Sequence, residues 1–385
     1  MFNKAKLPIF ITLSLSPISL VTMAEQPTYG ASQLMFEARN TCIVRFDDSV
    51  SKFDVEGMAR GLLVSANAKA KHIYSHSIKG FAVNMPCNQA KKAFGHNVSV
   101  IDFEQDSLVF AIAPPPGKGK NKDEEPNEPP ASETTPWGVS RVGGPFNGSG
   151  LTAWVIDTGV DLNHPDLIVD SSRGYSAFSN GPDSSPNDRH GHGTHVAGTI
   201  AAIDNDIDVV GVAAGATVIP VKVLDRRGSG TTSGVIAGID HVATNASAGD
   251  CANMSLGGGK SSSLDAAVQA LGATGVLVSL AAGNESQHAG NVSPAGANGP
   301  TIFTISATDI NDNFASFSNY GNPPVDYAAP GVAVLSLRVG GGTTTASGTS
   351  MAAPHACGVL LSGSQTSDGA ANGDPDGSPD PIIHL

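Results

Sequence analysis

The chain has 385 residues, enough for two or three domains whose cores need no metal or disulfide to hold them together. Its 22 basic and 35 acidic side chains give a net charge of −13, which argues against a nucleic-acid-binding surface. Beyond the N-terminus, no apolar stretch approaches the ~20 residues that a membrane span requires. We therefore expect a soluble exterior, with neither nucleic acid nor a membrane as a partner of the mature protein.

Residues 1–24 have the pattern of a secretory signal peptide. Lys4 and Lys6 supply the positive start, residues 7–21 are largely apolar, and Thr22-Met23-Ala24 is a small-residue cleavage site. The alternative is a disordered or anchoring N-terminus. The pattern favours export, so we expect a secreted, extracellular protein.

Residues 25–113 are predicted to form a small α+β domain. Strands are expected at 42–46, 78–83 and 99–106, and helices at 54–65 and 88–95. One further strand is unclear, and residues 72–75 are the candidate for it. With that strand, the β-α-β-β-α-β order gives a ferredoxin-like fold. The alternative is an unrelated small domain.

Residues 114–134 are predicted to be an exposed linker, because Pro, Gly and charged residues dominate it and cannot bury a core.

From residue 135 to 385, apolar runs alternate with helical stretches. Strands are expected at 151–156, 218–224, 275–281 and 301–307, and helices at 193–203, 233–245 and 262–271. This alternation predicts an α/β domain with a parallel sheet covered by helices on both faces. The 35 residues after Ser350 are mostly turn formers, so one flank of the sheet should be thinly covered.

Three glycine-rich segments carry an Asp, a His and a Ser in that order. They are Val155-Ile156-Asp157-Thr158-Gly159, residues 190–198 around His192, and residues 347–355 around Ser350. A serine hydroxyl is a poor nucleophile until an imidazole takes its proton, and the imidazole needs a carboxylate to fix its tautomer. Asp157 ends a predicted strand, where sites form in parallel sheets, while His192 and Ser350 each precede a predicted helix.

This order, and the Gly-Thr-Ser-Met-Ala context of Ser350, resemble the subtilisin-like serine proteases (subtilases). The resemblance covers residues 136–361 and is nearer to subtilisin and proteinase K than to the proprotein convertases. It implies that Ser350 is the nucleophile, His192 the general base and acid, and Asp157 its orienter. Of the two competing histidines, His190 and His195, the latter is expected to be a packed structural residue.

The resemblance also implies the groups that bind the oxyanion and the substrate. Asn284, in Ala-Ala-Gly-Asn-Glu, would be the oxyanion donor, with a turn asparagine as the alternative. Two glycine-rich edges would hold an extended peptide between them, and two small residues would line the first pocket with the segment around Val292. These residues are Gly228, Ser229, Gly230, Ser255, Leu256 and Gly257 for the edges, and Ala281 and Gly283 for the pocket. With no buried acid there, aromatic or aliphatic side chains are expected before the cut, rather than Lys or Arg.

Structural calcium is implied at two places, and no catalytic cofactor is expected. The loop at 202–212 would bind Ca²⁺ through carbonyl and side-chain oxygens of Ile203, Asn205, Ile207 and Val209, together with Asp166 and, as a further ligand, Glu133. A weaker candidate joins Asp309 to the carbonyls of Pro300 and Ile302. Ligation by oxygen alone suits Ca²⁺ rather than a transition metal.

The four cysteines fit an oxidising compartment. Pairing Cys42 with Cys87 and Cys251 with Cys357 keeps each bridge within one segment, and it is one of three possible pairings. Free buried thiols remain the alternative for the second pair.

We therefore expect a secreted serine endopeptidase, made as a self-processing zymogen and acting as a monomer on proteins and peptides. Residues 25–113 resemble the inhibitor propeptide of many subtilases, so the chain's own propeptide would be an intramolecular inhibitor. The alternatives are a catalytically silent binding protein on the same fold and an esterase with the same triad.

Overall fold

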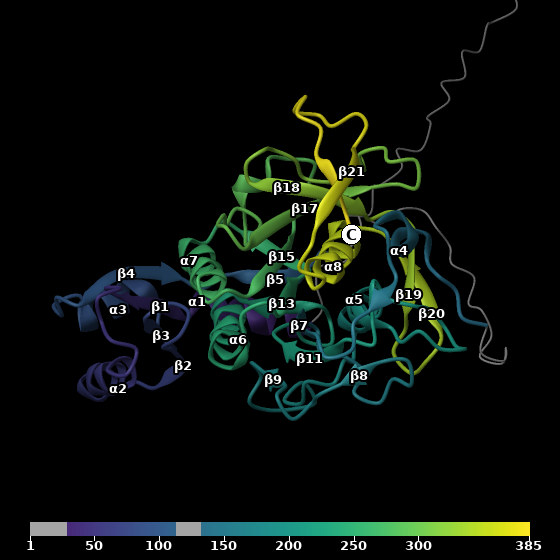
Figure 1. Cartoon of the computed structure of the whole chain (residues 1–385). Helices are drawn as coiled ribbons and strands as arrows, with labels where there is room; N and C mark the ends of the chain where they lie inside the picture. Colours follow the sequence, from purple (N-terminus) through teal and green to yellow (C-terminus); the bar gives the residue numbers. More distant parts are fainter. Residues whose placement is uncertain (1–28, 113–131) are drawn as a thin grey trace, which may run out of the picture.

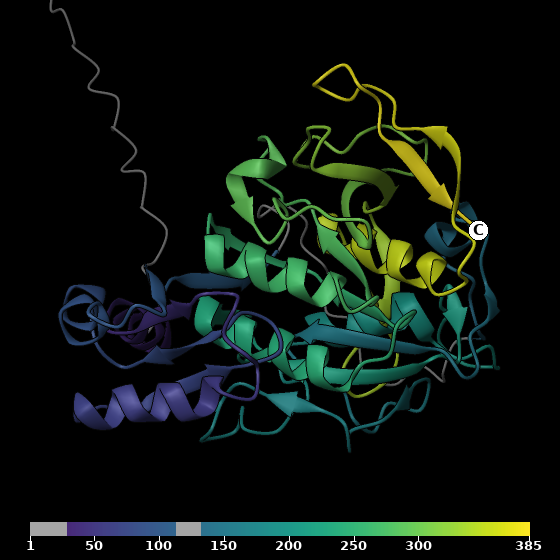
Figure 2. The same cartoon turned by 60° about the vertical axis from the view of Figure 1, so that its left-hand side comes forward.

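The computed structural model describes residues 29–112 and 132–385. A small N-terminal domain lies beside a larger α/β domain, and an extended strand runs from the first onto the surface of the second (Figures 1 and 2). The predicted signal peptide and most of the predicted linker lie outside the described residues.

The N-terminal domain is a four-stranded antiparallel sheet with the strand order β2-β3-β1-β4, the ferredoxin-like order. Its elements are α1 (Tyr29–Arg39), β1 (Cys42–Phe46), α2 (Val55–Ser65), β2 (Ala70–Tyr74), β3 (Gly80–Val83), α3 (Cys87–Phe94) and β4 (Val100–Gln105). Helices α2 and α3 pack on one face around Phe46, Phe81 and Phe94. The strand that the sequence leaves unclear is β2, which begins before the expected residues 72–75.

The larger domain is built on a sheet that has ten strands within the described residues. Their order is β21-β22-β18-β17-β15-β13-β7-β11-β8, with β9 also paired to β11. The strands are β7 (Thr152–Asp157), β8 (Ile168–Val169), β9 (Tyr175–Ser176), β11 (Thr217–Lys222), β13 (Cys251–Met254), β15 (Leu277–Ala281), β17 (Ile302–Thr308), β18 (Val325–Pro330), β21 (Thr366–Ala370) and β22 (Pro381–His384). All neighbours pair in parallel except β21 and β22.

Helices cover both faces of this sheet, as the sequence predicts. They are α5 (His192–Ala201), α6 (Thr232–Asn245), α7 (Ser262–Gly272) and α8 (Thr349–Leu360). Along β7, Trp154 and Ile156 point into the core shared with α6 and α7, while Ala153 and Val155 point into the core that contains α5 and part of α8. This alternation follows from the two-residue period of a strand, and it places α5 and α8 on the same face.

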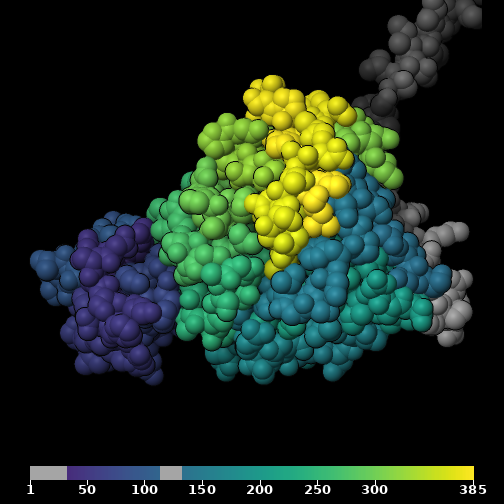
Figure 3. Space-filling view, viewed as in Figure 1, coloured from purple at the N-terminus to yellow at the C-terminus, as the bar shows by residue number. Residues whose placement is uncertain are grey.

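The C-terminal residues differ from the prediction. They form the antiparallel pair β21–β22, and β22 extends the sheet beyond β18, so the flank expected to be thinly covered is closed by the chain's own end. Ile382 and Ile383 are fully buried there. Figure 3 shows the C-terminal segment, in yellow, packed against the rest of the domain.

Both expected disulfides are present, Cys42–Cys87 within the N-terminal domain and Cys251–Cys357 between β13 and α8. The remaining elements are α4 (Trp137–Arg141), β6 (Phe146–Asn147), β10 (Ala213–Ala214), the 3₁₀ helix η1 (Ala289–Asn291), β19 (Val334–Leu337) and β20 (Thr343–Ala346). Within the described ranges, no helix has both the length and the apolar character needed to cross a membrane.

The two domains meet through one strand, two helix ends and the side of α6, where Asp240 accepts hydrogen bonds from the Ser77 N–H and hydroxyl at 2.6 and 2.9 Å. Strand β5 (Leu108–Ala111) lies between β12 (Ser229–Thr231) and β14 (Leu256–Gly259) and is antiparallel to both, with β16 (Val292–Ser293) beyond β14. Asp106 accepts hydrogen bonds from the Ser233 N–H and hydroxyl at 2.9 and 2.6 Å, in the first turn of α6. Glu104 accepts one from the Ser263 N–H at 2.9 Å, in the first turn of α7. Carboxylates are favoured at these positions because helix N-termini carry unpaired N–H groups and a positive dipole end.

Candidate active site

Asp157 and His192 are joined at the carboxyl edge of the sheet. Asp157 is the last residue of β7 and His192 the first of α5, and the imidazole Nδ1 lies 2.8 and 3.0 Å from the two carboxylate oxygens. Burial disfavours the imidazolium, but the charge and hydrogen bond of Asp157, together with the charge of Asp188, raise the pKa of His192 above its ordinary value. The pair has the geometry of a base held in one tautomer by a carboxylate.

Ser350 lies in the first turn of α8 and is fully buried. Its hydroxyl donates to the Ser255 carbonyl oxygen at 2.9 Å. The Nε2 of His192 is buried and has no hydrogen-bond partner among the described residues. The fold thus connects Asp157 to His192. The Ser350 hydroxyl instead points to the carbonyl of Ser255, the residue before β14, and it would have to turn toward His192 Nε2 to lose its proton.

Asp188 is a buried residue of this site that sequence reasoning missed. Its carboxylate accepts hydrogen bonds from the backbone N–H groups of His190, Gly191 and Thr194, at 2.8 to 3.0 Å. It thereby holds the turn that precedes His192 and satisfies the start of α5. The only sequence signal was an Asp two residues before His190, which is also the pattern of an ordinary turn.

Asn284 lies beside the carbonyl oxygen of Ile112, the residue that follows β5. Its side-chain nitrogen donates to that oxygen at 3.4 Å, and its own carbonyl oxygen accepts from the Thr349 N–H at 2.9 Å. A Cβ at Gly348 would lie 3.0 Å from the Asn284 nitrogen and 3.3 Å from the Ile112 oxygen, and the φ of Gly348 is +149°. Glycine is therefore required at 348 for both backbone and space.

The predicted substrate edges are the strands that flank β5. Gly228 accepts a hydrogen bond from the Ala111 N–H at 2.8 Å, and Ser255 accepts one from the Ile112 N–H at 3.5 Å. In the strand register, Ser229 and Gly257 face Phe110, Gly230 faces Val109, and Leu256 faces Ala111. All six edge residues thus border the segment that ends at Ile112.

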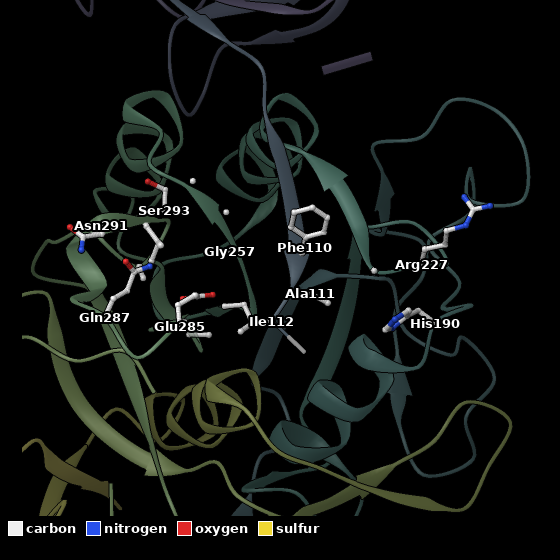
Figure 4. A pocket seen from close by; sticks show the side chains of 17 residues that line it. Phe110, Ala111, Ile112, His190, Arg227, Gly257, Glu285, Gln287, Asn291 and Ser293 are labelled. Atoms are coloured by element: carbon white, nitrogen blue, oxygen red, sulfur yellow. The ribbon is translucent and has the colours of Figure 1, made fainter. Parts of the chain in front are cut away.

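A pocket of about 690 Å³ surrounds this segment. Figure 4 shows Phe110, Ala111 and Ile112 running through it, with Gly257 and Glu285 on one side and Arg227 and His190 on the other. The predicted pocket residues Ala281, Gly283 and Val292 also line it. Glu285 is an exposed carboxylate that the sequence analysis did not place there, and it accepts a hydrogen bond from Asn319 at 2.7 Å.

The competing histidines take different positions. His195 is buried, its Nε2 lies 3.1 Å from the Val334 carbonyl oxygen, and burial lowers its pKa to about 4. It is a packed histidine of α5. His190 lines the pocket, and its Nδ1 accepts a hydrogen bond from the His192 N–H at 3.3 Å.

The first predicted calcium loop brings the side chains of Asp166 and Glu133 to Asn205. Asp166 is fully buried and accepts hydrogen bonds from the Asn205 amide at 2.6 Å and the Val209 N–H at 3.4 Å. Glu133 accepts one from the Asn205 N–H at 2.5 Å. Within the described residues, no cluster of three or more His, Cys, Asp or Glu side chains could hold a metal, so carbonyl oxygens such as those of Ile203 and Ile207 would have to complete the set. Such a mixed oxygen donor set fits Ca²⁺.

The second predicted calcium set is wrong. Pro300 and Ile302 lie at the start of β17, whereas Asp309 follows its end and accepts hydrogen bonds from its own turn. Seven residues of strand separate them, and at ~3.3 Å per residue this is about 20 Å, too far to share one ion. The carboxylate that lies near the start of β17 is Asp326, which accepts from the Thr304 N–H at 2.9 Å.

Comparisons with known proteins identify the family to which the chain is similar. A model described as the subtilase family matches residues 148–368. The subtilisin-like serine protease AsES of Sarocladium strictum is 38% identical over 337 residues, covering 83% of this chain and 78% of that protein. A cuticle-degrading protease of Metarhizium anisopliae is 34% identical over 376 residues, covering 93% and 88%. The crystal structure of a cold adapted subtilisin-like serine proteinase superimposes with a TM-score of 0.58 at 41% identity, covering 65% of this chain and 98% of that one.

Proposed function

The chain belongs to the subtilase family and is a serine-type endopeptidase, and on this premise we propose that Asp157, His192 and Ser350 are its catalytic triad. Ser350 Oγ attacks the substrate carbonyl carbon, His192 Nε2 takes the proton and returns it to the departing amine, and Asp157 stabilises the imidazolium. Asn284 and the Ser350 N–H bind the oxyanion. The observation that carries the proposal is the hydrogen bond between Asp157 and His192, at the edge where a peptide carbonyl meets Asn284.

A fluorophosphonate probe tests this assignment, because it reacts with an activated serine and not with an ordinary one. We expect one adduct on the mature enzyme, mapped to Ser350 by peptide mass spectrometry and absent from Ser350→Ala. A folded, processed enzyme that takes up no probe at Ser350 would favour the silent binding protein instead.

We further propose that residues 25–113 are an inhibitory propeptide and that the enzyme removes it by itself. Supporting this, β5 occupies the groove between β12 and β14, and Ser350 is fully buried beneath the segment that ends at Ile112. Purified Ser350→Ala protein should stay uncut when no other protease is present.

We also propose that the protein is secreted and that it binds one structural calcium ion. The signal-like residues 1–24 and the two disulfides support secretion into an oxidising compartment. The carboxylates of Asp166 and Glu133, both beside Asn205, support one structural Ca²⁺. The ion would stabilise the loop and take no part in peptide hydrolysis.

A further inference from the structure

We propose that the bond cut in self-processing is the one that links Ile112 to Ala113. The segment Val109-Phe110-Ala111-Ile112 is then the enzyme's own first substrate, with Ile112 as the residue before the cut. This inference rests on the proposed function and adds to it the bond and the side chains that the groove selects.

The backbone contacts fix which residue stands before the cut. The Ala111 N–H donates to the Gly228 carbonyl on one side, and the Ile112 N–H points to the Ser255 carbonyl on the other. Among the described residues, the strand pairing ends at Ala111. Ala111 is thus the last described residue that both edges align, and Ile112 continues along the Ser255 edge. A shift by one residue would exchange the sides to which successive N–H groups point.

The carbonyl of Ile112 is the one positioned for attack. Its oxygen lies 3.4 Å from the Asn284 side-chain nitrogen. A Cβ at Gly348 would lie 3.3 Å from the Ile112 oxygen, 3.0 Å from the Asn284 side-chain nitrogen and 3.7 Å from the Ser350 backbone nitrogen, so these three polar atoms surround one small space beside Gly348. A tetrahedral oxyanion on Ile112 would form between two donors.

Val109 and Ile112 are buried while Phe110 between them is exposed, so the groove encloses two side chains that lie three residues apart. Val109 is 1% and Ile112 8% exposed, whereas Phe110 is 45% exposed. Ile112 packs with Ala281, and a Cβ at Gly257 would lie 3.2 Å from its Cδ1. The pocket for Ile112 is thus apolar at its base, with the Glu285 carboxylate as the acidic group among its lining residues. The groove should select an aliphatic residue before the cut and a second one three residues earlier.

The step is acyl transfer followed by hydrolysis. Ser350 Oγ forms a bond to the Ile112 carbonyl carbon, and its proton passes to His192 Nε2. The bond to the Ala113 nitrogen then breaks, and that nitrogen takes the proton from His192. Water next releases Ile112 as a free carboxylate and restores Ser350.

The test follows the released fragment, because later trimming of the mature N-terminus does not alter it. Purified full-length precursor is allowed to process alone, and the released fragment is digested with trypsin. We expect a peptide that begins at Ala93 and ends at Ile112, since no Lys or Arg lies between Lys92 and Ile112. A fragment ending elsewhere, from an enzyme that still takes up fluorophosphonate at Ser350, would overturn this inference and leave the proposed function standing.

A matched pair of variants tests the role of the buried side chain. Ile112→Asp should slow processing at least about tenfold, because a carboxylate would enter an apolar pocket beside Glu285. Val98→Asp should process within about twofold of wild type, because Val98 is 97% exposed in the N-terminal domain and lies outside the segment. Ile112→Leu should retain the wild-type cut and thereby show that the precursor folds with a changed residue 112. Equal rates for the two aspartate variants would overturn the assignment, and so would a Ser350→Ala precursor that is cut at Ile112.

Discussion

The Asp188 carboxylate accepts a hydrogen bond from the Thr158 hydroxyl at 3.0 Å, across 30 residues of chain. Thr158 in turn accepts one from the Gly193 N–H at 2.9 Å, and its own N–H donates to Asp157 at 2.6 Å. Asp188 therefore connects the turn after β7 to the start of α5, which are the two segments that carry Asp157 and His192. It acts as a positioning residue for the pair, because it touches neither substrate nor reacting atoms.

Replacing Asp188 by Asn should lower the pKa of His192. The negative charge of Asp188 favours the imidazolium, so removing it makes His192 a neutral base at lower pH. The acid limb of the kcat/KM profile, measured from about pH 5 to about pH 9, should move to lower pH. The value of kcat/KM on the plateau should also fall, by about 10- to 100-fold, because the base is held less precisely.

Asp183→Asn is the matched control for that variant. Asp183 is also buried and lies five residues earlier, but its carboxylate contacts Lys222 and Arg226 rather than the turn before His192. The acid limb of the kcat/KM profile of Asp183→Asn should coincide with that of the wild-type enzyme. An unmoved acid limb in Asp188→Asn would reduce Asp188 to a purely structural role.

Ser350→Ala and His192→Ala should each abolish most peptidase activity, and the double variant should lose little more. The reason is that nucleophile and base act as one unit, so removing either disables both. The loss should be about 10⁶-fold in kcat, a magnitude taken from subtilisin itself rather than derived for this chain. Hydrolysis of a chromogenic peptide by protein matured in trans provides the measurement. Activity of Ser350→Ala within tenfold of wild type would refute the triad.

Asp106→Asn should weaken inhibition by the isolated propeptide. In the full chain, the Asp106 side chain is fully enclosed and receives two hydrogen bonds from Ser233 at the start of α6. Loss of a charged, buried hydrogen-bonding group costs about 1.5–3 kcal/mol, which corresponds to at least about a tenfold rise in the inhibition constant. The mature enzyme titrated with residues 25–112 would show this rise.

Asp102→Asn serves as the comparison for Asp106, because the Asp102 carboxylate bonds to the N–H of its own neighbour, Phe103. Its inhibition constant should stay close to that of the unmodified propeptide. The same loss of affinity in both variants would mean that net charge, and not the contact with α6, holds the propeptide.

Calcium removal should lower the melting temperature and expose residues 203–209 to self-digestion. An ion bound only by the folded state adds RT ln(1 + [L]/Kd), about 4 kcal/mol at a thousandfold excess over Kd. Asp166→Asn should mimic the chelator and remove most of its effect in a thermal melt with and without chelator. Asp309→Asn, at the far end of β17, should keep the full wild-type response. If chelation shifts Asp166→Asn as much as wild type, the main calcium site lies elsewhere.

Several elements could be predicted because a short local stretch of sequence is enough to indicate them. The apolar run at 151–156 and the glycine-flanked motifs around His192 and Ser350 allow a strand and two helix starts to be placed, and β7, α5 and α8 agree with them. By contrast, β2 contains Lys71 and His72 and is only partly buried, so its pattern is weak. Strand β22 is four residues long, and its burial depends on a partner more than 50 residues away.

The site shows the same division. Residues inside a recognisable motif could be named, but the role of Asp188 depends on Thr158, which a local pattern does not reveal. Asp309 was misassigned for a related reason. It is close to Ile302 in sequence, and only the extended conformation of β17 shows that the two lie at opposite ends of a strand. Residues that are near in sequence can lie far apart in space when they are at the two ends of a strand, as Ile302 and Asp309 are. Residues that are far apart in sequence can be neighbours when their strands pair, as Ala328 and Ile382 are.

The strand β5 has a consequence for the choice of targets. If the proposed self-processing removes it, β12 and β14 would face each other across a gap one strand wide, and each would present unpaired backbone N–H and C=O groups. Only a stretch of chain that is extended, with both of its edges free, can occupy that gap. A helix presents no such edges, and an inner strand of a folded sheet has already used them. The enzyme would thus choose first by shape and only then by side chain, cutting at loose loops and unfolded tails. Each such cut would loosen its target and create further segments of the required shape.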